Sequence, residues 1–563
     1  MKVIIVGGVA GGATAAARIR RLDERAQIII FERSGYVSYA NCGLPYYVGG
    51  VITDPQELTL QTPERFDKRF RIDVRVHHEV TAIDPERKCV TVRNLETGSV
   101  FTESYDKLLL SPGAKPVMPR MKGTTGERIF TLRTVEDTLR IRQFVEQAHP
   151  RTAVLAGGGY IGLEMAENLT GLGVQVTIVQ RPQQLLSPLD ADMACLVHAK
   201  LRSKGIRLML GSTVTGFEHD SQQVTTLLDG QDPLHADMVL LAIGVTPDTA
   251  LAKEAGLRLG IKESIAVNDR METSHPDIYA VGDAVEVRHA VTGQRALISL
   301  AGPANKQARI AADNICGLCS RYTGAQGSSV LKLFDMTIAT TGIKEAQAIA
   351  SGMDCDAVVL SPGSHASYYP GATVMTMKVI YERGTLRLLG AQIIGRDGVD
   401  KRIDVLATAI HAGLTATQLC ELDLAYAPPY SSAKDPVNMA GYMIENIETG
   451  RVQQFHIGDL ETLPRDGSVT LLDVRTPGEY ARGHIEGFVN IPLDDLREHI
   501  GQIPQDKPVY VICHSGLRSY LACRILMQNN LTCYNFSGGY SFYQAVTAER
   551  CAAESAYPCG MPR

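Results

Sequence analysis

The sequence predicts an α/β protein of several domains, two of which bind dinucleotides. At 563 residues and 61.1 kDa, the chain is too long for one hydrophobic core, and three or four domains of ordinary size are expected. Residues 3–21 and 153–169 each run from a short apolar strand through a glycine-rich turn into a helix. That order is typical of Rossmann-like units, in which the turn and the helix N-terminus bind a pyrophosphate.

Composition excludes several classes of function. Hydrophobic residues make up 45% of the chain and charged residues 21%, and no apolar run is long enough to span a bilayer. A net charge of -5 with a pI near 6.3 argues against nucleic acid as a partner. The N-terminus enters a strand without a cleavable signal pattern, so we expect a cytoplasmic protein with no membrane partner, whose twelve cysteines are mostly reduced. The cysteines include one CxxC, Cys316 and Cys319, but no second pair at zinc spacing, so we predict no metal site.

The first glycine-rich turn follows the strand at residues 3–8 and leads into a helix from Ala13. Val9 stands in place of the middle glycine of the GxGxxG pattern, which weakens the fingerprint. A second strand, residues 28–32, ends in Glu32 at the distance where an acid binds a ribose hydroxyl, and this supports the interpretation. The predicted contacts to the first dinucleotide are Gly7, Gly8, Val9, Ala10, Gly11, Gly12, Glu32, Arg33, Ser111, Pro112 and Gly113.

The second turn has the complete GxGxxG pattern between a strand and a helix. The strand that follows, residues 175–179, leads to Gln180 and Arg181, so the acid that usually selects NAD over NADP is missing. The preference between NADH and NADPH therefore stays open. The predicted contacts to this dinucleotide are Gly157, Gly159, Tyr160, Ile161 and Gly162.

Cys42 lies in the run SYANCGLPYY, residues 38–47, just downstream of the first dinucleotide unit. If this run opens a helix, unpaired amides and the helix dipole favour a thiolate at Cys42. A redox role follows from that position. The alternative is a small buried thiol, the commonest fate of a free cysteine.

The two turns, the returning run SPGA (residues 111–114), the run GVTP (244–247) and the run TSHPDIYAVGDA (273–284) occur in the order found in the pyridine nucleotide-disulfide oxidoreductase family. Residues 1–445 resemble that family. The resemblance implies FAD and NAD(P)H as cofactors, with Asp283 contacting the ribityl chain of FAD. Ordinary disulfide reductases of this family carry a second cysteine five positions after the first, but here that position is Tyr47.

The run around Cys42 resembles the motif of coenzyme A disulfide reductases, a group that includes persulfide and polysulfide reductases. This implies that Cys42 cycles through a mixed disulfide with coenzyme A. The histidine that the family places in the helix after the FAD aspartate is Asn305 here. A basic run at residues 65–71 supplies further cations for the phosphates, although a solvated basic face is the alternative. The resemblance places coenzyme A contacts at Thr14, Arg18, Arg21, Ser38, Asn41 and Lys434.

Residues 325–445 resemble the dimerisation domain of the family, with strands near 358, 378 and 390 and a helix from Val399 to Ala412. The resemblance implies a homodimer in which Tyr368 and Tyr426 lie over the active cysteine of the other subunit. Aromatic residues in loops are also often packing residues.

Residues beyond 454 resemble rhodanese domains through the runs LLDVRTPGEY (471–480) and CHSGLRS (513–519). The strand at 509–512 delivers Cys513 to a loop whose amides wrap an anion at a helix start, which favours a thiolate. Retention of Cys513 and Arg518 predicts sulfurtransferase activity; a binding module without activity is the alternative. Cys551 and Cys559 have no predicted role.

The predicted fold is therefore two Rossmann-like domains, an α+β dimerisation domain and a C-terminal α/β rhodanese domain. The domain boundaries are 1–115 with 255–325 for FAD, 116–254 for NAD(P)H, 326–447 for dimerisation and 454–550 for rhodanese.

Three functions are compatible with these motifs. The first is an NAD(P)H-dependent flavoenzyme that reduces coenzyme A disulfide, coenzyme A persulfide or polysulfide through Cys42, coupled to sulfur transfer by the rhodanese domain. The second is an NADH oxidase or peroxidase that uses a cysteine sulfenic acid, although peroxidases of the family have a histidine where this chain has Ala10. The third is a non-catalytic redox sensor. The sequence does not rank the three sulfur acceptors or show whether the two cysteines exchange sulfur directly.

Overall fold

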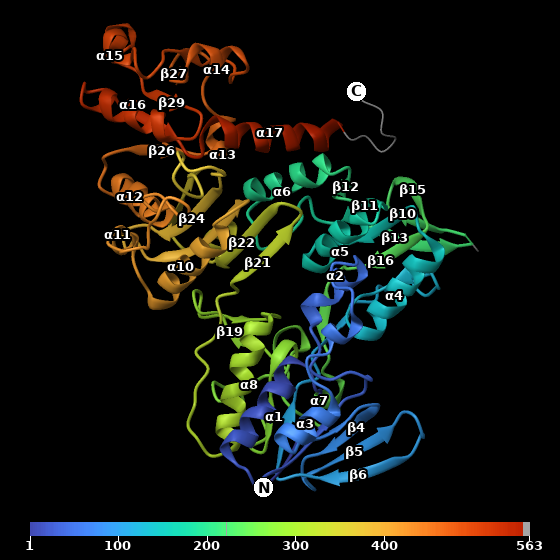
Figure 1. Ribbon diagram of the computed structural model, residues 1–563. Helices are drawn as coiled ribbons and strands as arrows, with labels where there is room; N and C mark the ends of the chain where they lie inside the picture. Colours follow the sequence, from blue (N-terminus) through green and yellow to red (C-terminus); the bar gives the residue numbers. More distant parts are fainter. Residues whose placement is uncertain (221, 556–563) are drawn as a thin grey trace. The chain divides into compact units, whose positions relative to one another are not determined.

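The computed structural model describes residues 1–220 and 222–555, which form two compact units (Figure 1). Unit 1 comprises Met1–Gln183 and Gly205–Gly327. Unit 2 comprises Gln184–Lys204 and the chain from Ser328 onward. Cys559 lies outside the described residues.

The first sheet of unit 1 is parallel and has five strands in the order β18-β7-β1-β2-β3. Its central strand is fully buried at Ile4 and Ile5, as expected for a parallel sheet covered on both faces. Helices α1 and α8 pack on each other beside it. The elements are β1 (Lys2–Val6), α1 (Ala10–Leu22), β2 (Gln27–Phe31), α3 (Pro63–Phe70), β3 (Asp73–Arg75), β7 (Lys107–Leu110), α7 (Ala250–Glu254), β18 (Ile278–Ala280) and α8 (Ala301–Ile315).

Smaller antiparallel sheets interrupt this Rossmann-like pattern in unit 1. The predicted β-rich excursion after the first unit is a three-stranded sheet, and two-stranded pairs occur further along the chain. Their strands are β4 (His78–Asp84), β5 (Cys89–Asn94), β6 (Val100–Ser104), β8 (Ala114–Pro116), β17 (Val245–Pro247), β19 (Val287–Arg288) and β20 (Arg295–Ala296).

The second parallel sheet of unit 1 has the order β12-β11-β10-β16-β9. It repeats the strand, glycine-rich turn and helix arrangement of the first sheet, which confirms the predicted pair of Rossmann-like folds. Its elements, with the adjoining helices and antiparallel strands, are α2 (Leu44–Val48), β9 (Ile129–Phe130), α4 (Val135–Ala148), β10 (Thr152–Ala156), α5 (Tyr160–Gly171), β11 (Gln175–Gln180), β12 (Arg207–Leu210), β13 (Val214–His219), β14 (Val224–Leu228), β15 (Gln231–Ala236) and β16 (Met238–Leu241).

Unit 2 contains an antiparallel five-stranded sheet in the order β21-β22-β25-β24-β23. The helix predicted from Val399 to Ala412 is confirmed with the same bounds, and its buried face packs on this sheet. The elements are β21 (Ser329–Leu333), β22 (Met336–Gly342), α9 (Glu345–Ala350), β23 (Cys355–Leu360), β24 (Thr376–Glu382), β25 (Leu388–Gly395), α10 (Val399–Ala412), α11 (Ala416–Cys420) and α12 (Pro436–Glu448).

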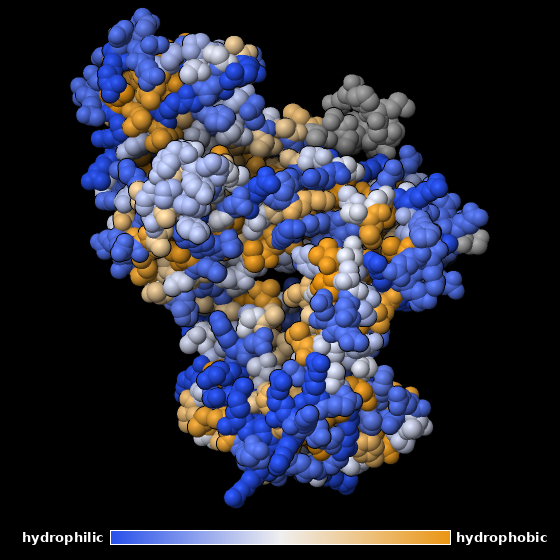
Figure 2. Space-filling model, in the orientation of Figure 1, coloured by the Kyte–Doolittle hydropathy of each residue, from blue (hydrophilic) through white to orange (hydrophobic). Residues whose placement is uncertain are grey.

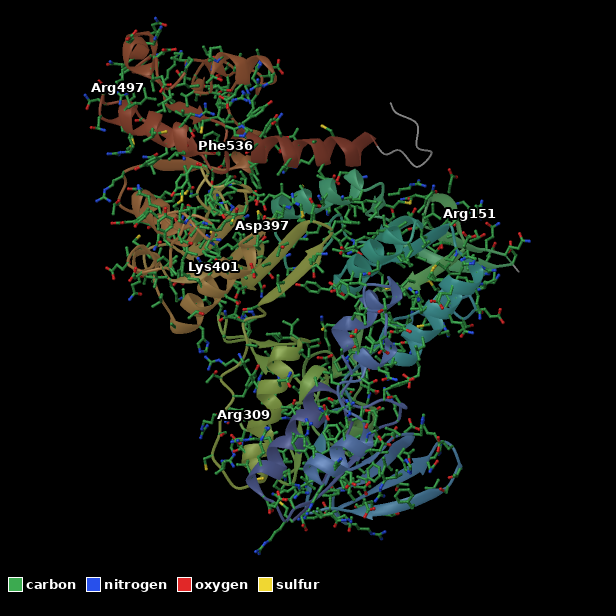
Figure 3. The ribbon with its side chains drawn as sticks, in the orientation of Figure 1. Arg151, Arg309, Asp397, Lys401, Arg497 and Phe536 are labelled. Carbon is green, nitrogen blue, oxygen red and sulfur yellow. The ribbon has the colours of Figure 1, made fainter. Side chains whose placement is uncertain are left out.

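The C-terminal part of unit 2 is a second, parallel sheet in the order β26-β30-β29-β27-β28. Phe536, labelled in Figure 3, packs against Phe455 with ring centroids 5.0 Å apart in a buried cluster of this domain. The elements are β26 (Gln453–Phe455), α13 (Ile457–Leu460), β27 (Thr470–Asp473), α14 (Pro477–Ala481), β28 (Val489–Asn490), α15 (Leu496–His499), β29 (Val509–Ile512), α16 (Leu517–Met527), β30 (Cys533–Phe536) and α17 (Gly539–Ser555).

Helix α6 (Ala191–Ser203) joins two strands of unit 1 in sequence but packs within unit 2. Its His198 and the Glu549 of α17 are both almost fully buried and face each other at 3.4 Å. Arg202 of α6 adds a salt bridge to the same carboxylate at 3.0 Å. The helix predicted to belong to the NAD(P)H domain is thus held by the C-terminal helix, and the predicted boundaries remain a sequence-based prediction.

No helix within residues 1–220 and 222–555 is long and apolar enough to cross a membrane. The face seen in Figure 2 mixes hydrophilic and hydrophobic residues over both units.

Candidate functional site

The first glycine-rich turn is shaped for a dinucleotide by its close approach to neighbouring backbone. Gly7 has a φ of +94°, and a Cβ there would lie 2.2 Å from the carbonyl oxygen of Ser111. A Cβ on Gly12 would lie 1.8 Å from the carbonyl oxygen of Gly7. Because only glycine fits, the turn can present its backbone to a phosphate. Buried Glu32 accepts a hydrogen bond from the Gly8 amide at 2.8 Å, so the predicted acid lies beside the predicted turn.

The second turn repeats this geometry with an amide in place of the acid. Gly157 has a φ of +112°, and a Cβ there would lie 2.2 Å from the carbonyl oxygen of Ala242. Gln180 accepts from the Gly158 amide at 2.9 Å, as Glu32 does in the first turn. The exposed Arg181 follows directly. The site therefore has a neutral side chain and a cation where NAD-selective sites place a carboxylate.

Cys42 lies in a three-residue 3₁₀ turn, Asn41–Gly43, directly before α2, and it is exposed. Protein atoms around the sulfur displace part of its water, and this loss of solvation raises the pKa of the Cys42 thiol. Glu164 and Asp283 raise this pKa further, whereas Arg133 lowers it. The prediction that a helix start stabilises the thiolate of Cys42 is therefore wrong in this structure. A short turn and a five-residue helix supply little dipole, and the loss of solvation, followed by carboxylates from other elements, outweighs it.

Arg133 links the loop of Cys42 to the predicted FAD aspartate. Its Nη2 donates to Asp283 Oδ2 at 2.7 Å. With its amide oriented to satisfy both groups, Asn41 donates to the Arg133 carbonyl at 3.1 Å and accepts from Nη1 at 3.2 Å. Sequence reasoning missed Arg133 because it lies outside every motif.

Tyr46 and Glu164 form a second neighbouring group that the sequence did not reveal. The Tyr46 hydroxyl and the Glu164 carboxyl group influence each other's ionisation. Burial raises the pKa of Glu164 to about 7, and burial together with Glu164 raises the pKa of Tyr46 to about 12. The two helices that carry them, α2 and α5, pack closely, since a Cβ on Gly49 would lie 1.9 Å from Asn168 Oδ1.

The residues predicted to contact coenzyme A lie on α1 and in the loop before Cys42. Thr14 Oγ1 donates to Asn305 Oδ1 at 2.5 Å, and Arg18 forms a salt bridge to Asp313 at 2.8 Å. Arg21 is exposed. Ser38 has a φ of 49° and donates its amide to Gly8 at 2.8 Å, which ties this loop to the first glycine turn.

Three further residues predicted to contact FAD or coenzyme A lie outside α1 and the loop before Cys42. Arg33 forms a salt bridge to Asp248 at 3.0 Å in unit 1. Lys434 is exposed in unit 2. Ser111, which with Pro112 and Gly113 forms the returning loop, meets the first turn as the sequence predicts.

The two predicted tyrosines come together although 58 positions separate them. Their hydroxyl oxygens are 2.9 Å apart, and the residues are 74% and 47% exposed for Tyr368 and Tyr426. Lys401 of α10, labelled in Figure 3, supports the second loop by donating to the carbonyl of Ala425 at 3.3 Å. Two hydroxyls this exposed are presented for contact rather than packed in a core.

Cys513 lies at the bottom of the loop between β29 and α16 and is fully buried. Its sulfur accepts from the Gly516 amide at 3.1 Å and from the Ser519 hydroxyl at 3.2 Å. Arg518 does not reach the sulfur by a hydrogen bond; it donates twice to Glu479, at 2.7 Å each. These hydrogen bonds from Arg518 lower the pKa of Glu479 well below its usual range.

Cys42 and Cys513 belong to different units. Each is a free cysteine in the structure. The roles assigned to the predicted site residues therefore remain predictions.

Three family models match the chain. Residues 1–308 match the pyridine nucleotide-disulphide oxidoreductases, residues 328–436 match the dimerisation domain of the same enzymes, and residues 457–545 match the rhodanese-like domain.

Individual proteins agree with these matches. A coenzyme A disulfide reductase from Staphylococcus aureus (strain JH9) is 38% identical over 442 residues, which are 78% of this chain and 99% of the relative. The crystal structure of a reduced CoADR-RHD from Bacillus anthracis has a TM-score of 0.95 at 46% identity and covers 98% of both chains. An NAD-dependent persulfide reductase from A. fulgidus has a TM-score of 0.91 at 37% identity and covers 96% of this chain and all of its own.

Proposed function

Because the chain belongs to the pyridine nucleotide-disulphide oxidoreductases, we propose that it reduces coenzyme A persulfide or coenzyme A disulfide, or polysulfide, through Cys42. As a member of this family the protein is a flavoenzyme that uses FAD and NAD(P)H. When bound, FAD supplies electron transfer from the nicotinamide to sulfur. The proposal concerns the acceptor and the link to the rhodanese domain.

The observation that carries the proposal is the isolation of Cys42. Cys42 is exposed and forms no disulfide. Within the described residues, the groups that interact electrostatically with its thiol include Tyr46, Glu164 and Arg133, and no second cysteine is among them. A thiol without an internal partner has to form its disulfide with a small molecule. The cations of α1 and Lys434 suit the phosphates of coenzyme A, and the relatives are named for coenzyme A disulfide and persulfide reduction.

The rhodanese domain shifts the preference towards sulfane sulfur. Cys513 has two donors aimed at its sulfur, the arrangement that stabilises a negative sulfur during transfer. We propose that Cys513 accepts a sulfane sulfur and passes it to coenzyme A or to the Cys42 site. Tethering both thiols in one chain raises the effective concentration of one for the other.

An acceptor comparison tests this function. NADH and NADPH oxidation is measured without oxygen using coenzyme A disulfide, coenzyme A persulfide and polysulfide in turn, with oxygen and peroxide as separate acceptors. The proposal expects a sulfur acceptor to be reduced fastest and Cys42→Ser to lose that activity. Faster turnover with oxygen or peroxide would favour the oxidase or peroxidase instead.

The purified protein offers a second test. We expect it to be yellow and to carry a coenzyme A adduct on Cys42, which intact mass measured before and after a reductant reveals. Only free thiol in every preparation would count against a mixed-disulfide cycle.

Two substitutions test the sulfur relay. Cys513→Ser should stop the reduction of sulfur supplied by a donor such as thiosulfate but leave the reduction of preformed coenzyme A persulfide intact. Reduction of donor-derived sulfur at the full rate in Cys513→Ser would show that the rhodanese is a separate activity.

A further inference from the structure

The loop that carries Cys513 is held tightly by the start of α17. The amide of Tyr540 donates to the carbonyl oxygen of Cys513 at 2.8 Å. A Cβ on Gly539 would lie 2.7 Å from the backbone nitrogen of Ser515, so the helix start packs directly against the loop. Because this packing leaves the loop backbone little freedom, the choice of sulfur donor depends on the side chains around the loop.

Arg518 is the one arginine or lysine in the loop run CHSGLRS, residues 513–519. It directly precedes Ser519, whose hydroxyl donates to the sulfur of Cys513 at 3.2 Å. Both Nη atoms of its guanidinium donate to the carboxylate of Glu479 on α14, at 2.7 Å each. The side chains of this pair are only 32% and 21% exposed. The cation of the loop is therefore occupied by a bidentate ion pair that water screens little.

Glu479 is fixed in this pair because it also caps the start of α14. Its Oε2 accepts from the amide and from the hydroxyl of Thr476, at 2.9 Å each. The amide of Glu479 donates back to Thr476 Oγ1 at 3.3 Å, which completes a capping box. An anion that approaches Cys513 has to compete with this fixed carboxylate for the guanidinium of Arg518.

The neighbouring Arg475 does not take the place of Arg518. It is fully buried, and its guanidinium donates to both carboxylate oxygens of Asp473 at 2.6 to 3.0 Å. It also lies over the ring of Tyr540, 3.7 Å from the centroid. The two ion pairs carry no net charge, and the amide and hydroxyl that donate to the sulfur are neutral groups. The loop is therefore built for a sulfur anion of low charge.

We propose that Glu479 sets the donor preference of this loop: by holding Arg518 in an ion pair it withholds the cation that a sulfonate needs, so that Cys513 takes sulfur from persulfides of small thiols in preference to thiosulfate. Glu479 acts through Arg518 and is a positioning residue. The inference rests on the proposed sulfur transfer at Cys513.

The two donors differ in the charge of the group that leaves. With a persulfide, the Cys513 thiolate attacks the terminal sulfur, which moves to Cys513 with its proton; the S–S bond of the donor breaks, and a thiolate with one negative charge leaves. With thiosulfate, the same attack on the outer sulfur releases sulfite with two negative charges. Neither reaction needs an external oxidant or reductant. A free guanidinium stabilises a dianion more than a monoanion, so pairing Arg518 disfavours thiosulfate selectively.

The test measures donor choice on the full-length, flavin-loaded protein. Thiosulfate or glutathione persulfide is added to the reduced protein, and the rate at which Cys513 gains one sulfur is followed by rapid quenching and mass spectrometry of its peptide. Glu479→Gln keeps the size and the capping hydrogen bonds of the side chain but removes the charge that holds Arg518. The ratio of the thiosulfate rate to the persulfide rate should rise by about tenfold, the value of one uncovered hydrogen bond to a charged group.

Two further variants separate charge from shape. Glu498→Gln removes an exposed carboxylate from α15 of the same domain and should leave the ratio within about twofold of the parental value. Glu479→Gln combined with Arg518→Gln should return the ratio to the parental value or below, because the gain requires the freed guanidinium. Damage to the loop structure alone would slow both donors together and leave the ratio unchanged.

Binding of inorganic sulfate provides a readout without turnover. Sulfate is a dianion that donates no sulfur, and it should bind about tenfold more tightly to Glu479→Gln than to the double variant in equilibrium dialysis at low ionic strength. Other anion sites of the chain are the same in these two variants, so the difference belongs to the loop.

The outcomes for Glu479 and for sulfur transfer are distinguishable. An unchanged donor ratio in Glu479→Gln, or equal sulfate binding by Glu479→Gln and the double variant, would overturn the inference and leave sulfur transfer at Cys513 intact. If neither donor adds sulfur to Cys513 in the parent protein, the proposed sulfur transfer fails, and sulfate binding alone decides whether Glu479 controls the charge of the loop.

Discussion

The two thiols of this chain occupy opposite environments. Cys513 is fully buried, and its sulfur receives two hydrogen bonds from its own loop. Cys42 is exposed, and partial loss of solvation, followed by acids from distant elements, raises the pKa of its thiol. The environment of Cys513 is formed by one contiguous motif, whereas that of Cys42 depends on groups from other elements and on whether they are protonated. A fixed environment suits a thiol that repeats one transfer, and an adjustable one suits a thiol that alternates between disulfide and thiolate.

The largest expected effect separates the two thiols completely. Cys42→Ser should reduce NAD(P)H-driven reduction on the order of a thousandfold because the nucleophile is lost, while thiosulfate-dependent sulfur transfer stays near the parental rate. Cys513→Ser should do the reverse. Steady-state assays of both activities on both variants check this. If either substitution abolished both activities, the two sites would not be independent.

A smaller change tests the fixed environment of Cys513. Ser519→Ala removes one of the two donors to the sulfur, and sulfur transfer should fall by about tenfold, the expected value for a lost hydrogen bond to a charged group. Ser515→Ala, in the same loop, is the matched control and should change the rate less than twofold, since the donors to Cys513 are the Gly516 amide and the Ser519 hydroxyl. Equal effects of the two substitutions would mean that loop shape, not the donor, controls the rate.

The adjustable site should also depend on a second copy of the chain. The dimerisation model matches residues 328–436, and Tyr368 and Tyr426 present their hydroxyls together at an exposed position. If Tyr426 serves the partner's Cys42, mixing Cys42→Ser with Tyr426→Phe chains should restore about a quarter of the parental sites, since half of random dimers are mixed and each has one intact site. Sulfur transfer by Cys513 should not respond to mixing. Reductase activity no higher than in the parent variants would contradict a shared site.

The smallest effect concerns the contact that keeps the rhodanese domain on its neighbour. His456 and Asp356 are 2.9 Å apart. Burial alone would raise the pKa of Asp356, but the histidine outweighs it and lowers this pKa to about 2. Burial alone would lower the pKa of His456, but the carboxylate outweighs it and raises this pKa above its usual value.

The sign of the pH dependence follows from these shifts. A histidine with a raised pKa stabilises fully below its unfolded pKa of about 6.5, and this contribution is lost as the pH rises through the folded value. Stability from the pair, about 1 to 2 kcal/mol, should therefore decline as the pH rises above about 6.5. Protease cleavage of the connection at residues 448–453 should accelerate over that range in the parent protein and stay level in His456→Gln. A level profile in the parent would show that the pair contributes nothing to docking.

Local motifs predicted the fixed parts of the molecule well. The distance from the first turn to Glu32 and the loop after residue 512 both follow from short stretches of sequence, and the structure places the predicted residues accordingly. The same holds for the helix from Val399 to Ala412, where the apolar period and two flanking glycines determine both ends.

The environment of Cys42 and the packing of α6 were not predictable because both arise from contacts between elements that are far apart in the sequence. Arg133 and Glu164 approach Cys42 only through the packing of loops and helices that are about 90 and 120 residues away along the chain. The prediction of a thiolate at a helix start failed for the same reason, since the short helix was visible in the sequence, whereas the loss of solvation and the opposing acids, which arise from packing, were not. Helix α6 likewise carries no signal that it packs with the C-terminal helix.

The packing of α6 bears on how such a chain can be recombined during evolution or in the laboratory. The sequence predicts a rhodanese domain that begins near Gln454, yet its last helix packs against the helix formed by residues 191–203. Exchanging this domain would therefore leave His198 and Arg202 without the carboxylate of Glu549. A successful transplant has to bring α6 with it or redesign that surface, so the inheritable module is larger than the sequence motif and is discontinuous in the gene.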